Sequence, residues 1–459
     1  MMDTLVSNTE NEKQTVCFPE ALLRNSLQEY TMESRPKIDK STNISQKYSP
    51  ETKPSGDLML ELANLGQKLQ LSVQEHLEPL TGIRPKPNDI GEVLSLDRTQ
   101  SWRISRMMGD DCPYTILYES PAPKGLRLII DAAQRAGAPQ ESVQAVLQVV
   151  QKYESILKRF PEGRAGLDGA LSARVPKARE ATSKKALRQV SIGMSQLLGL
   201  RASVRYVSGI LVPSENLDSK VDVVAAAGYV DLRRLRIGPS PVVFSGKVYT
   251  HKPGLNDPAL ETLDGDLDPD PRLRLLHEFG SIPPEALTLE PSGNELRLTL
   301  APDFPEINTP ITIFFGQRIA RSLERYQTKD RTHEVVHHAP VLPADINIFD
   351  TIIHKDLYHQ AKPPKLTIER FGFNPSTQSY KPDDASYRMD DEPQAVGLGM
   401  GIKRINTRDI PQLKDLQNSV FKRINHDPND FYVYRTTIEY LPPGFAVTVW
   451  IPLDEKPEN

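Results

Sequence analysis

The spacing of apolar residues changes once along the chain, near residue 200. Before that point apolar residues recur at the spacing of one helix face, and after it they gather in short runs rich in Val, Ile, Phe and Thr. Helices are predicted over 57–80, in two short pieces within 88–108, and over 125–137, 139–160 and 178–200. A late helix is predicted over 411–425, among strands over 204–212, 219–227, 241–248, 295–300, 311–318, 334–342, 346–355, 365–373, 432–440 and 445–453.

This order of elements predicts the α+β class. An all-helical N-terminal domain is expected over 57–200, followed by a β-rich mixed α+β domain over 201–459. Residues 1–56 are rich in Ser, Thr, Asn, Glu and Lys and show no sustained period, so we expect a disordered tail. The β-rich domain has a size that suits a module for sensing a ligand or for self-association.

The net charge, the cysteine count and the absence of long apolar stretches limit the kinds of function this chain can have. The chain has 459 residues and a formal net charge of −4, so nucleic-acid binding would need a local basic patch. Two cysteines, Cys17 and Cys112, are too few for a disulfide framework or a thiolate metal cluster. No apolar stretch is long enough for a signal peptide or a transmembrane helix, so a cytoplasmic protein without membrane contact is expected.

The most informative stretch is 88–108, which fits two short helices joined by a tight turn. Asn88 is expected to cap the first helix, and Gly91 would let the second helix cross closely. The apolar face of the first helix is expected to contain Ile90, Val93 and Leu94.

The second helix is expected to begin after Asp97, which would act as its N-cap and form a capping box with Gln100. Trp102 is expected to pack in the core. The inward face is predicted to consist of Ser101, Ile104, Ser105 and Met108. The outward side chains, which can bond phosphates and base edges in a major groove, are Arg98, Thr99, Gln100, Arg103 and Arg106.

This spacing resembles the helix-turn-helix of bacterial transcription regulators. Gly91 stands at the usual small position of the first helix, and Ser95-Leu96 stands where the turn normally carries glycine and an apolar residue. Ser101 departs from the pattern, because a branched apolar residue is expected there, so Trp102 would supply part of the packing. The resemblance implies a regulator that binds double-stranded DNA as a homo-oligomer and responds to a small-molecule effector.

Three neighbouring segments bear on this hypothesis. Helix 57–80 is expected to support 88–108 as the first helix of the domain. The segment 114–121 is expected to be a wing-like strand or a connector. Lys158–Arg188 contains nine Lys or Arg against three Asp or Glu, which fits either a solvated face or a set of phosphate contacts.

An alternative chemistry comes from 333–337, His-Glu-Val-Val-His, which matches the His-Glu-x-x-His pattern of zinc peptidases. That pattern requires a helix, whereas the two valines and the following Ala339-Pro340 favour a strand. In a strand the two histidines would stand about 13 Å apart, too far for one zinc ion. The histidines here, with His338, His354 and His359, are then expected to be solvated or hydrogen-bonded strand residues.

Three other features carry weaker expectations. Gly397–Gly401 is predicted to be a flexible hinge, because it lacks the strand and helix that flank a nucleotide loop. Asp345 and Asp350 are expected to form turns near strand ends. The terminal strands 432–440 and 445–453 are expected to pair and to offer a surface for self-association.

The sequence therefore predicts a DNA-binding transcription regulator with a C-terminal domain for ligand sensing or self-association. It predicts no catalytic residue, no metal ligand and no cofactor. Two alternatives stay open: a zinc-dependent peptidase that uses 333–337, and a non-enzymatic interaction module whose helix-turn-helix contacts protein.

Overall fold

The structure is a computed structural model. It describes residues 16–17, 55–215, 217–238, 242–247, 258–267, 270–292, 295–329, 331–358, 363–370, 389 and 393–456. The chain divides into two compact units: 32–185, called here the helical unit, and 186–459 together with 1–31, called here the β unit. The division falls inside a helix, between Lys185 and Ala186, whereas the sequence pattern placed it at residue 200.

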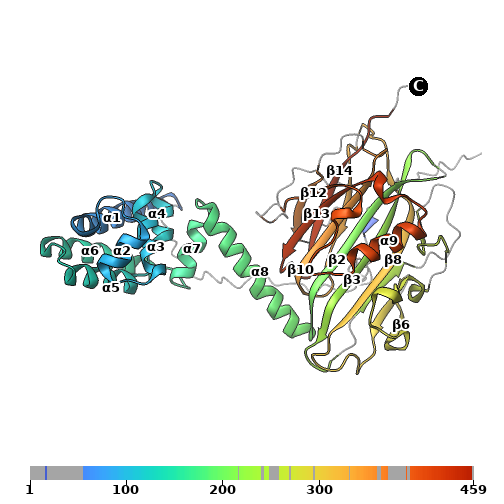
Figure 1. Cartoon of the computed structure of the whole chain (residues 1–459), viewed down its shortest axis with the longest axis horizontal. Helices are drawn as coiled ribbons and strands as arrows, with labels where there is room; N and C mark the ends of the chain where they lie inside the picture. The colour runs from blue at the N-terminus through green and yellow to red at the C-terminus, as the bar shows by residue number, and fades with distance from the viewer. Residues whose placement is uncertain are drawn as a thin grey trace, which may run out of the picture. The chain divides into compact units, whose positions relative to one another are not determined.

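Helices precede strands along the chain, so the predicted α+β class is confirmed. The helices up to the boundary between the units (Figure 1, blue to green) are α1 (Ser55–Thr81), α2 (Pro87–Leu94), α3 (Arg98–Gly109), α4 (Pro113–Glu119), α5 (Pro123–Arg135), α6 (Gln140–Leu157), α7 (Arg164–Leu171) and α8 (Pro176–Leu198).

Proline fixes where three of these helices begin. Pro87, Pro113 and Pro123 each occupy a first-turn position, where a missing N–H costs nothing. The N-cap of α2 is therefore Lys86, whose backbone N–H donates to the Asp89 carboxylate at 3.2 Å, and the predicted Asn88 cap is wrong. The predicted wing-like strand or connector over 114–121 is also wrong, because most of it forms α4.

One apolar core holds the helical unit together. Its buried side chains come from α1 to α7 and the start of α8. The long helix α1 packs chiefly against α4 and α6, and more lightly against α2 and α3. Among the largest contributors are Leu62, Leu65, Leu69, Ile90, Ile104, Met107, Leu126, Val146 and Tyr153.

A close crossing of α1 and α4 depends on Gly66. A Cβ atom added at Gly66 would lie 2.1 Å from the carbonyl oxygen of Pro113 and 3.4 Å from its Cα. Glycine in a helix interior destabilises the helix by about 1 kcal/mol relative to alanine. At position 66 this loss is accepted because only a residue without a Cβ atom allows α1 and α4 to pack this closely.

The β unit is built from three sheets. The large sheet has the strand order β12-β13-β10-β2-β3-β8-β5, the second has β1-β9-β14-β11, and the small third sheet has β4-β7-β6. In the large sheet β2 and β10 run parallel, and its other neighbouring pairs are antiparallel.

The predicted runs each correspond to a strand, although β3 and β8 continue well beyond the predicted ends, and no run was predicted for β1, β5, β6 or β12. The strands are β1 (Val16–Cys17), β2 (Leu200–Pro213), β3 (Lys220–Arg234), β4 (Val242–Lys247), β5 (Ala259–Glu261), β6 (Leu287–Ser292), β7 (Glu295–Leu300), β8 (Ile311–Glu324), β9 (His333–His338), β10 (Ala344–His354), β11 (Lys365–Arg370), β12 (Val396–Met400), β13 (Phe431–Glu439) and β14 (Phe445–Pro452).

Alternating side chains of the large sheet fill two separate cores. Val207, Val223 and Phe349 point to one face, where they meet Val447 and Val449 of the second sheet. On the opposite face, the same strands contribute Tyr206, Val224 and Ile348 to a core covered by α9 (Leu413–Arg423). The unit is therefore three layers deep around the large sheet, with α9 lying across its strands in Figure 1.

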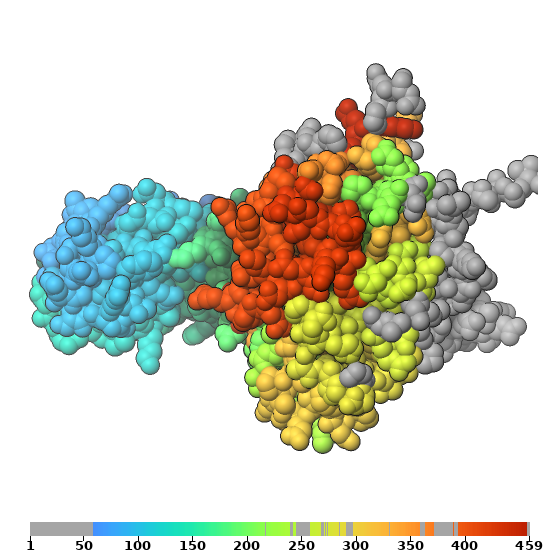
Figure 2. All heavy atoms as spheres, turned by 45° about the vertical axis from the view of Figure 1, so that its right-hand side comes forward, coloured from blue at the N-terminus to red at the C-terminus, as the bar shows by residue number. Residues whose placement is uncertain are grey.

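The segment that contains α9 also contacts the stretch before β6. Gln412 donates to the Phe279 carbonyl at 2.8 Å, Ser419 donates to Glu278 at 3.0 Å, and Arg423 pairs with Asp264. Figure 2 shows these two parts of the chain, red and yellow, meeting on one face of the β unit. Apolar side chains of the small sheet form a further core against the ends of β2, β3 and β8.

Two sequence expectations in this unit are wrong. β13 and β14 do not pair with each other, because β13 joins the large sheet and β14 lies inside the second sheet. Gly397–Gly401 is mostly the strand β12, paired with β13 through a bulge, and not a hinge. The expected tail 1–56 lies outside the described residues, except for the start of α1 and Val16–Cys17, which form β1 alongside β9.

Gly66→Ala should destabilise the helical unit, because the added methyl group would collide with backbone atoms of Pro113. Overpacking of this kind costs about 1–3 kcal/mol, more than alanine gains in helix propensity. Urea unfolding followed by circular dichroism measures the effect. Gly169→Ala in α7 is the matched control, since its Cβ would meet nothing within 4 Å and should be neutral or stabilising. Equal unfolding midpoints for the two variants would contradict the close-crossing interpretation.

Candidate nucleic-acid interface

Helices α2 and α3 are joined by a short, sharp turn. Ser95, which caps the C-terminus of α2, has a φ of 53°, in the left-handed region where glycine is usual. The next residue, Leu96, donates its backbone N–H to the Gly91 carbonyl at 3.2 Å. This turn sets the angle at which α3 leaves α2.

The predicted close crossing at Gly91 is present. A Cβ on Gly91 would lie 3.2 Å from the Oγ of Ser101, which is 1% exposed. The Ser101 hydroxyl donates to the Asp97 carbonyl at 2.9 Å, so its polarity is satisfied inside its own helix. Ser101 therefore fills the position where the helix-turn-helix pattern has a branched apolar residue, and Trp102 does not supply the packing expected of it.

The predicted inward faces of the two helices differ from the structure at three positions, because Val93 is exposed, Ser105 is only half-buried, and buried Met107 was not assigned to the face. Ile90 and Leu94 are buried, but Val93 is 40% exposed and lies outside the apolar face assigned to it. In α3 the buried residues are Ser101, Ile104, Met107 and Met108.

Both ends of α3 are fixed by side chains. The Asp97 carboxylate accepts from the backbone N–H groups of Thr99 at 2.8 Å and Gln100 at 3.0 Å, which confirms the predicted N-cap. At the other end, Nε2 of Gln70 on α1 lies within hydrogen-bonding distance of the carbonyls of Met107 and Asp110. Helix α1 therefore supports α3, as expected, in part because the Gln70 amide binds the carbonyls at the end of α3.

The predicted outward residues do not share one environment. Arg98, Thr99 and Arg103 are exposed, whereas Gln100 and Arg106 are half-buried. Thr99 and Arg103 are four positions apart and share one face of the N-terminal half of α3, whereas Arg98 lies about 100° around the helix from Thr99, on the face of Trp102.

Arg106 is committed to a contact within the helical unit. Its guanidinium pairs with Glu119 at the end of α4 at 3.1 Å, and Glu119 is 6% exposed. The same carboxylate accepts from Lys177, in the first turn of α8, at 2.9 Å. Arg106 therefore orients α3 on α4 and α8, which differs from the purely outward role predicted for it.

Trp102 is on the surface, so its predicted core position is wrong. The ring is 48% exposed and lies four positions after Arg98 on α3. The Arg106 guanidinium carbon lies 4.7 Å from the ring centroid and the Lys177 ammonium 5.9 Å from it. These cations hold the indole in a defined orientation while leaving it half open to solvent.

Much of the basic run Lys158–Arg188 serves the structure. Arg164 donates to the carbonyls of Ser120 and Tyr118 at the end of α4 and pairs with Asp168. Arg159 pairs with Glu61 of α1 at 2.6 Å. These basic residues are thus bound to groups of the helical unit itself, so their presence does not require phosphate contacts.

The His-Glu-x-x-His residues lie in strand β9, and their side chains have separate partners. His333 contacts Thr332 at 2.9 Å, and Nδ1 of His337 contacts Thr448 at 3.0 Å. Glu334 accepts from the backbone of Glu324 and from Arg331, although burial still raises the pKa of Glu334. The helical geometry of the zinc-peptidase pattern is absent here.

His338 lies on the other face of β9, inside the core between the two larger sheets. It is 3% exposed, and its ring centroid lies 5.4 Å from that of Phe349. Burial, followed by the charges of Arg205 and His337, holds the pKa of His338 well below 6.5. His359, which was grouped with these histidines, lies outside the described residues.

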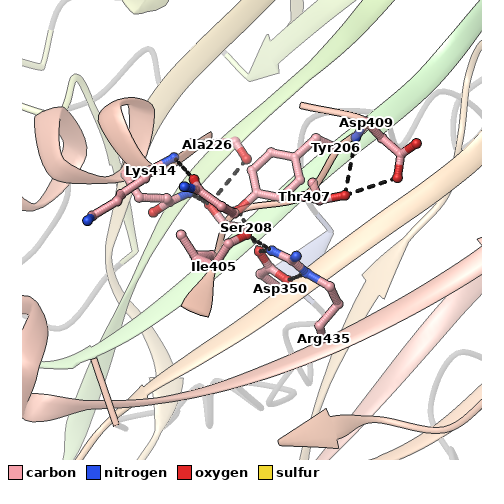
Figure 3. Close-up of polar contacts among 11 residues, drawn as sticks. Tyr206, Ser208, Ala226, Asp350, Ile405, Thr407, Asp409, Lys414 and Arg435 are labelled. Carbon is pink, nitrogen blue, oxygen red and sulfur yellow. Dashed lines mark hydrogen bonds and ion pairs between the residues drawn. The ribbon is translucent and has the colours of Figure 1, made fainter. Parts of the chain in front are cut away.

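Among the described residues, a buried polar network crosses the large sheet under α9 (Figure 3). Asp350 accepts two hydrogen bonds from Arg435, both at 2.7 Å, and one from the Tyr206 hydroxyl at 2.8 Å. Gln417 of α9 donates to the hydroxyls of Tyr206 at 3.0 Å and Ser208 at 2.8 Å. Burial raises the pKa of Asp350 while Arg435 opposes the shift, and burial raises the pKa of Tyr206 well above 10.

This network pins neighbouring elements to the sheet. Arg435 also donates to the Ile405 carbonyl at 2.7 Å, in the segment between β12 and α9. Asp350 and Asp345 both lie within β10, where they pair with Arg435 and Arg201, so the predicted turn-forming role of both residues is wrong. The network joins residues that lie far apart along the chain.

Several residues of this interface were not found from the sequence. Gln70, Glu119 and Lys177 fix α3, yet each is an ordinary polar residue of an amphipathic helix. The sequence did contain a signal for the exposed position of Trp102. Trp102 lies four positions after Arg98 on α3, so the two side chains share one helical face.

Comparisons with known proteins assign no family. No family model and no curated protein matches the chain. A solved structure of a candidate protease from Parabacteroides distasonis is 9% identical with a TM-score of 0.23. That match covers 55% of this chain and 40% of the other, and at this TM-score it supports no conclusion about fold or activity.

Within the described ranges, no group of three or more His, Cys, Asp or Glu side chains is placed to hold a metal ion. Among the helices of the same ranges, none combines the length and the apolar character needed to cross a membrane.

The stability of the β unit should fall as the pH drops below about 6.5, because an unfolded histidine then gains a proton that folded His338 does not accept. Each such proton contributes up to about 1.4 kcal/mol per pH unit. His338→Gln should reduce the slope of unfolding free energy against pH between 6.5 and 5. His277→Gln, at an exposed histidine, is the control, and a wild-type slope in His338→Gln would contradict this prediction.

Proposed function

We propose that the helical unit binds double-stranded DNA by inserting α3 into the major groove, and that the chain is a transcription regulator of bacterial type. One observation carries this proposal. The N-terminal half of α3 presents Arg98, Thr99 and Arg103 to solvent on a helix whose two ends and opposite face are fixed. A helix held in this way can present base-reading side chains with little loss of entropy on binding.

The chemistry of the three exposed side chains suits a groove. An arginine can donate two parallel hydrogen bonds to the O6 and N7 atoms of guanine, and a threonine hydroxyl can bond a base edge or a phosphate. We assign base reading to Arg103 and phosphate or base contact to Arg98 and Thr99. The exposed indole of Trp102 adds an apolar surface of the kind that can meet a thymine methyl group.

For the β unit we propose a separate role in sensing a small-molecule effector or in self-association. Its large sheet is covered on both faces, by the second sheet and by α9, which suits a rigid scaffold more than a groove reader. A DNA-reading helix needs such a partner module when the regulator responds to a signal.

The exposure of Trp102 also favours a second candidate, an interaction module that binds a protein through α3. Tryptophan and arginine are enriched in protein interfaces, and both are present on this surface. Salt separates the two candidates, because affinity for DNA falls steeply with salt through counterion release, while a protein contact of this size depends on salt far less.

The test of the proposed function is selection of bound fragments from a random DNA pool by the full chain in low salt. Enrichment of one sequence motif, lost on raising the salt, is the expected result. No retained DNA at low salt would overturn the proposal and leave the interaction module.

Arg103→Ala should weaken binding to a selected fragment by about 1–3 kcal/mol, roughly 5- to 150-fold, because one bidentate base contact is lost. Fluorescence anisotropy with a labelled duplex measures the change, and circular dichroism should show unchanged helix content. Arg135→Ala removes an exposed arginine from α5 and is the matched control for loss of charge. Equal effects of the two substitutions would assign the loss to net charge and remove Arg103 from the interface.

A further inference from the structure

Two histidines meet where a strand of the large sheet ends beside the end of α9. His354 is the last residue of β10, and His426 lies in the segment between α9 and β13. Their ring centroids are 6.0 Å apart and the rings are inclined at 67°, so the edge of one ring faces the other. The two side chains therefore join the strand to the segment that leaves the helix covering it.

Two phenylalanines pack around this pair. The ring of Phe431, the first residue of β13, lies 4.9 Å from that of His354 and 5.9 Å from that of His426. Phe421, near the end of α9, packs against Phe431 at 4.9 Å. His354 is 9% exposed and His426 is half-buried. A charged imidazolium would lose much of its hydration here, so the neutral form of each ring is favoured.

The hydrogen bond of His354 requires a ring nitrogen without a proton. The backbone N–H of Asp356 donates to Nδ1 of His354 over 3.3 Å. A proton on Nδ1 would remove this acceptor and leave two N–H groups pointing at each other. The turn that follows β10 is therefore formed against the neutral ring.

The charges around His354 do not compensate a proton on it. Oδ2 of Asp356 lies 3.6 Å from Nδ1, but this carboxylate is 62% exposed and is screened by water. Asp430 is bound to Lys355 at 2.7 Å, and Lys355 and Arg325 add positive charge near the ring. Burial, opposed in part by Asp356 and Asp430, lowers the pKa of His354 below 6.5.

His426 faces a similar balance of charges from other elements. Its charged neighbours are Arg318 of β8, Asp222 of β3 and Glu215 in the segment after β2. Asp222 is bound to Arg318, and Glu215 is exposed. Burial first, and the positive charge of His354 next, lower the pKa of His426 below 6.5.

The charged groups of α9 and of the segment after it are also engaged or in solvent. Arg423 pairs with Asp264, Asp427 accepts from the backbone N–H of Asn429 at 2.9 Å, and Lys422 is exposed. The carbonyl groups at the end of α9 favour a proton on His426, but burial outweighs them.

We propose that His354 and His426, called here the histidine clasp, hold residues 424–430 against the end of β10 and release them when both rings are protonated. The first proton on His354 removes the hydrogen bond from Asp356. The second creates two positive charges on rings whose centroids are 6.0 Å apart, and these charges repel each other. Separation of the two rings into water relieves both effects.

Opening of the clasp loosens the end of the helix that covers one face of the large sheet. Ile424 and Phe431, at the two ends of the released segment, belong to the apolar core under α9. The clasp thus makes the covering of this face depend on pH. All of its residues lie in the β unit, so this inference goes beyond the proposed DNA binding and does not depend on it.

The direction of the pH dependence follows from proton binding. Released histidines have an ordinary pKa of about 6.5, and the clasped rings bind a proton less readily, so the clasp is stable above that pH and weakens as the pH falls. Two histidines make opening more favourable by up to about a hundredfold per pH unit, and one histidine by up to about tenfold.

The first experiment is amide hydrogen exchange of the full chain at about pH 7.5 and about pH 5, corrected for intrinsic exchange rates. Residues 421–431 should lose protection on acidification at least about tenfold more than β2, the internal reference. The double variant His354→Asn with His426→Phe, which keeps an acceptor beside Asp356 and a ring beside Phe431, should lose this difference. His277→Asn, at an exposed histidine, should behave as the wild type.

Two outcomes of this experiment would overturn the clasp. One is a wild type in which residues 421–431 lose no more protection than β2. The other is a double variant that keeps the acid-induced loss, which would place the titrating group elsewhere.

A titration of the imidazole groups, by NMR on a chain labelled at histidine, tests whether the two rings act together. His354→Asn should raise the pKa of His426, because the neighbouring positive charge is gone. A role of His354 in packing alone would not produce this shift. His277→Asn should leave the pKa of His426 as in the wild type, and an unchanged pKa of His426 in His354→Asn would overturn the proposal.

Discussion

The presentation of α3 depends on one buried carboxylate. Glu119 ends α4 in the interior of the helical unit, where a charge without partners would be very costly. Its partners, Arg106 and Lys177, come from α3 and α8, so satisfying this one group fixes three helices together. Arg164 completes the arrangement by binding the free carbonyls at the end of α4. The ion pairs of Glu119 therefore set the orientation of α3, and with it the side of α3 that faces solvent.

Local signals were enough to predict most of the elements. Asp97 was identified as an N-cap because its side chain bonds amides only two and three residues away. Gly91 was identified as a crossing point because α2 and α3 are adjacent in the chain. Strand β7 was predicted at its observed bounds, since its alternation and flanking residues are local. The side of α3 that faces solvent followed largely from helical period, except at Trp102.

Long-range pairing could not be obtained in this way. Asp350 and Arg435 are 85 positions apart, and nothing in either neighbourhood specifies the other. The same is true of Gln70, whose amide reaches α3 from 37 or more positions away. Trp102 was misplaced because an indole looks apolar in a period count, whereas Arg106 and Lys177 stabilise it at the surface. The order of strands in each sheet, including the pairing of β14 with β9 and β11, is likewise a long-range feature that local sequence signals do not specify.

The central position of β14 in the second sheet constrains how the β unit can assemble. Strands β9 and β11 have no direct contact in that sheet, because β14 lies between them and pairs with both. During synthesis both strands emerge before β14, so the edges that pair with β14 stay open until Phe445–Pro452 has been made. Open strand edges pair readily with other chains. Until β14 is in place, the unfinished β unit therefore exposes two strand edges that favour association with other chains over folding.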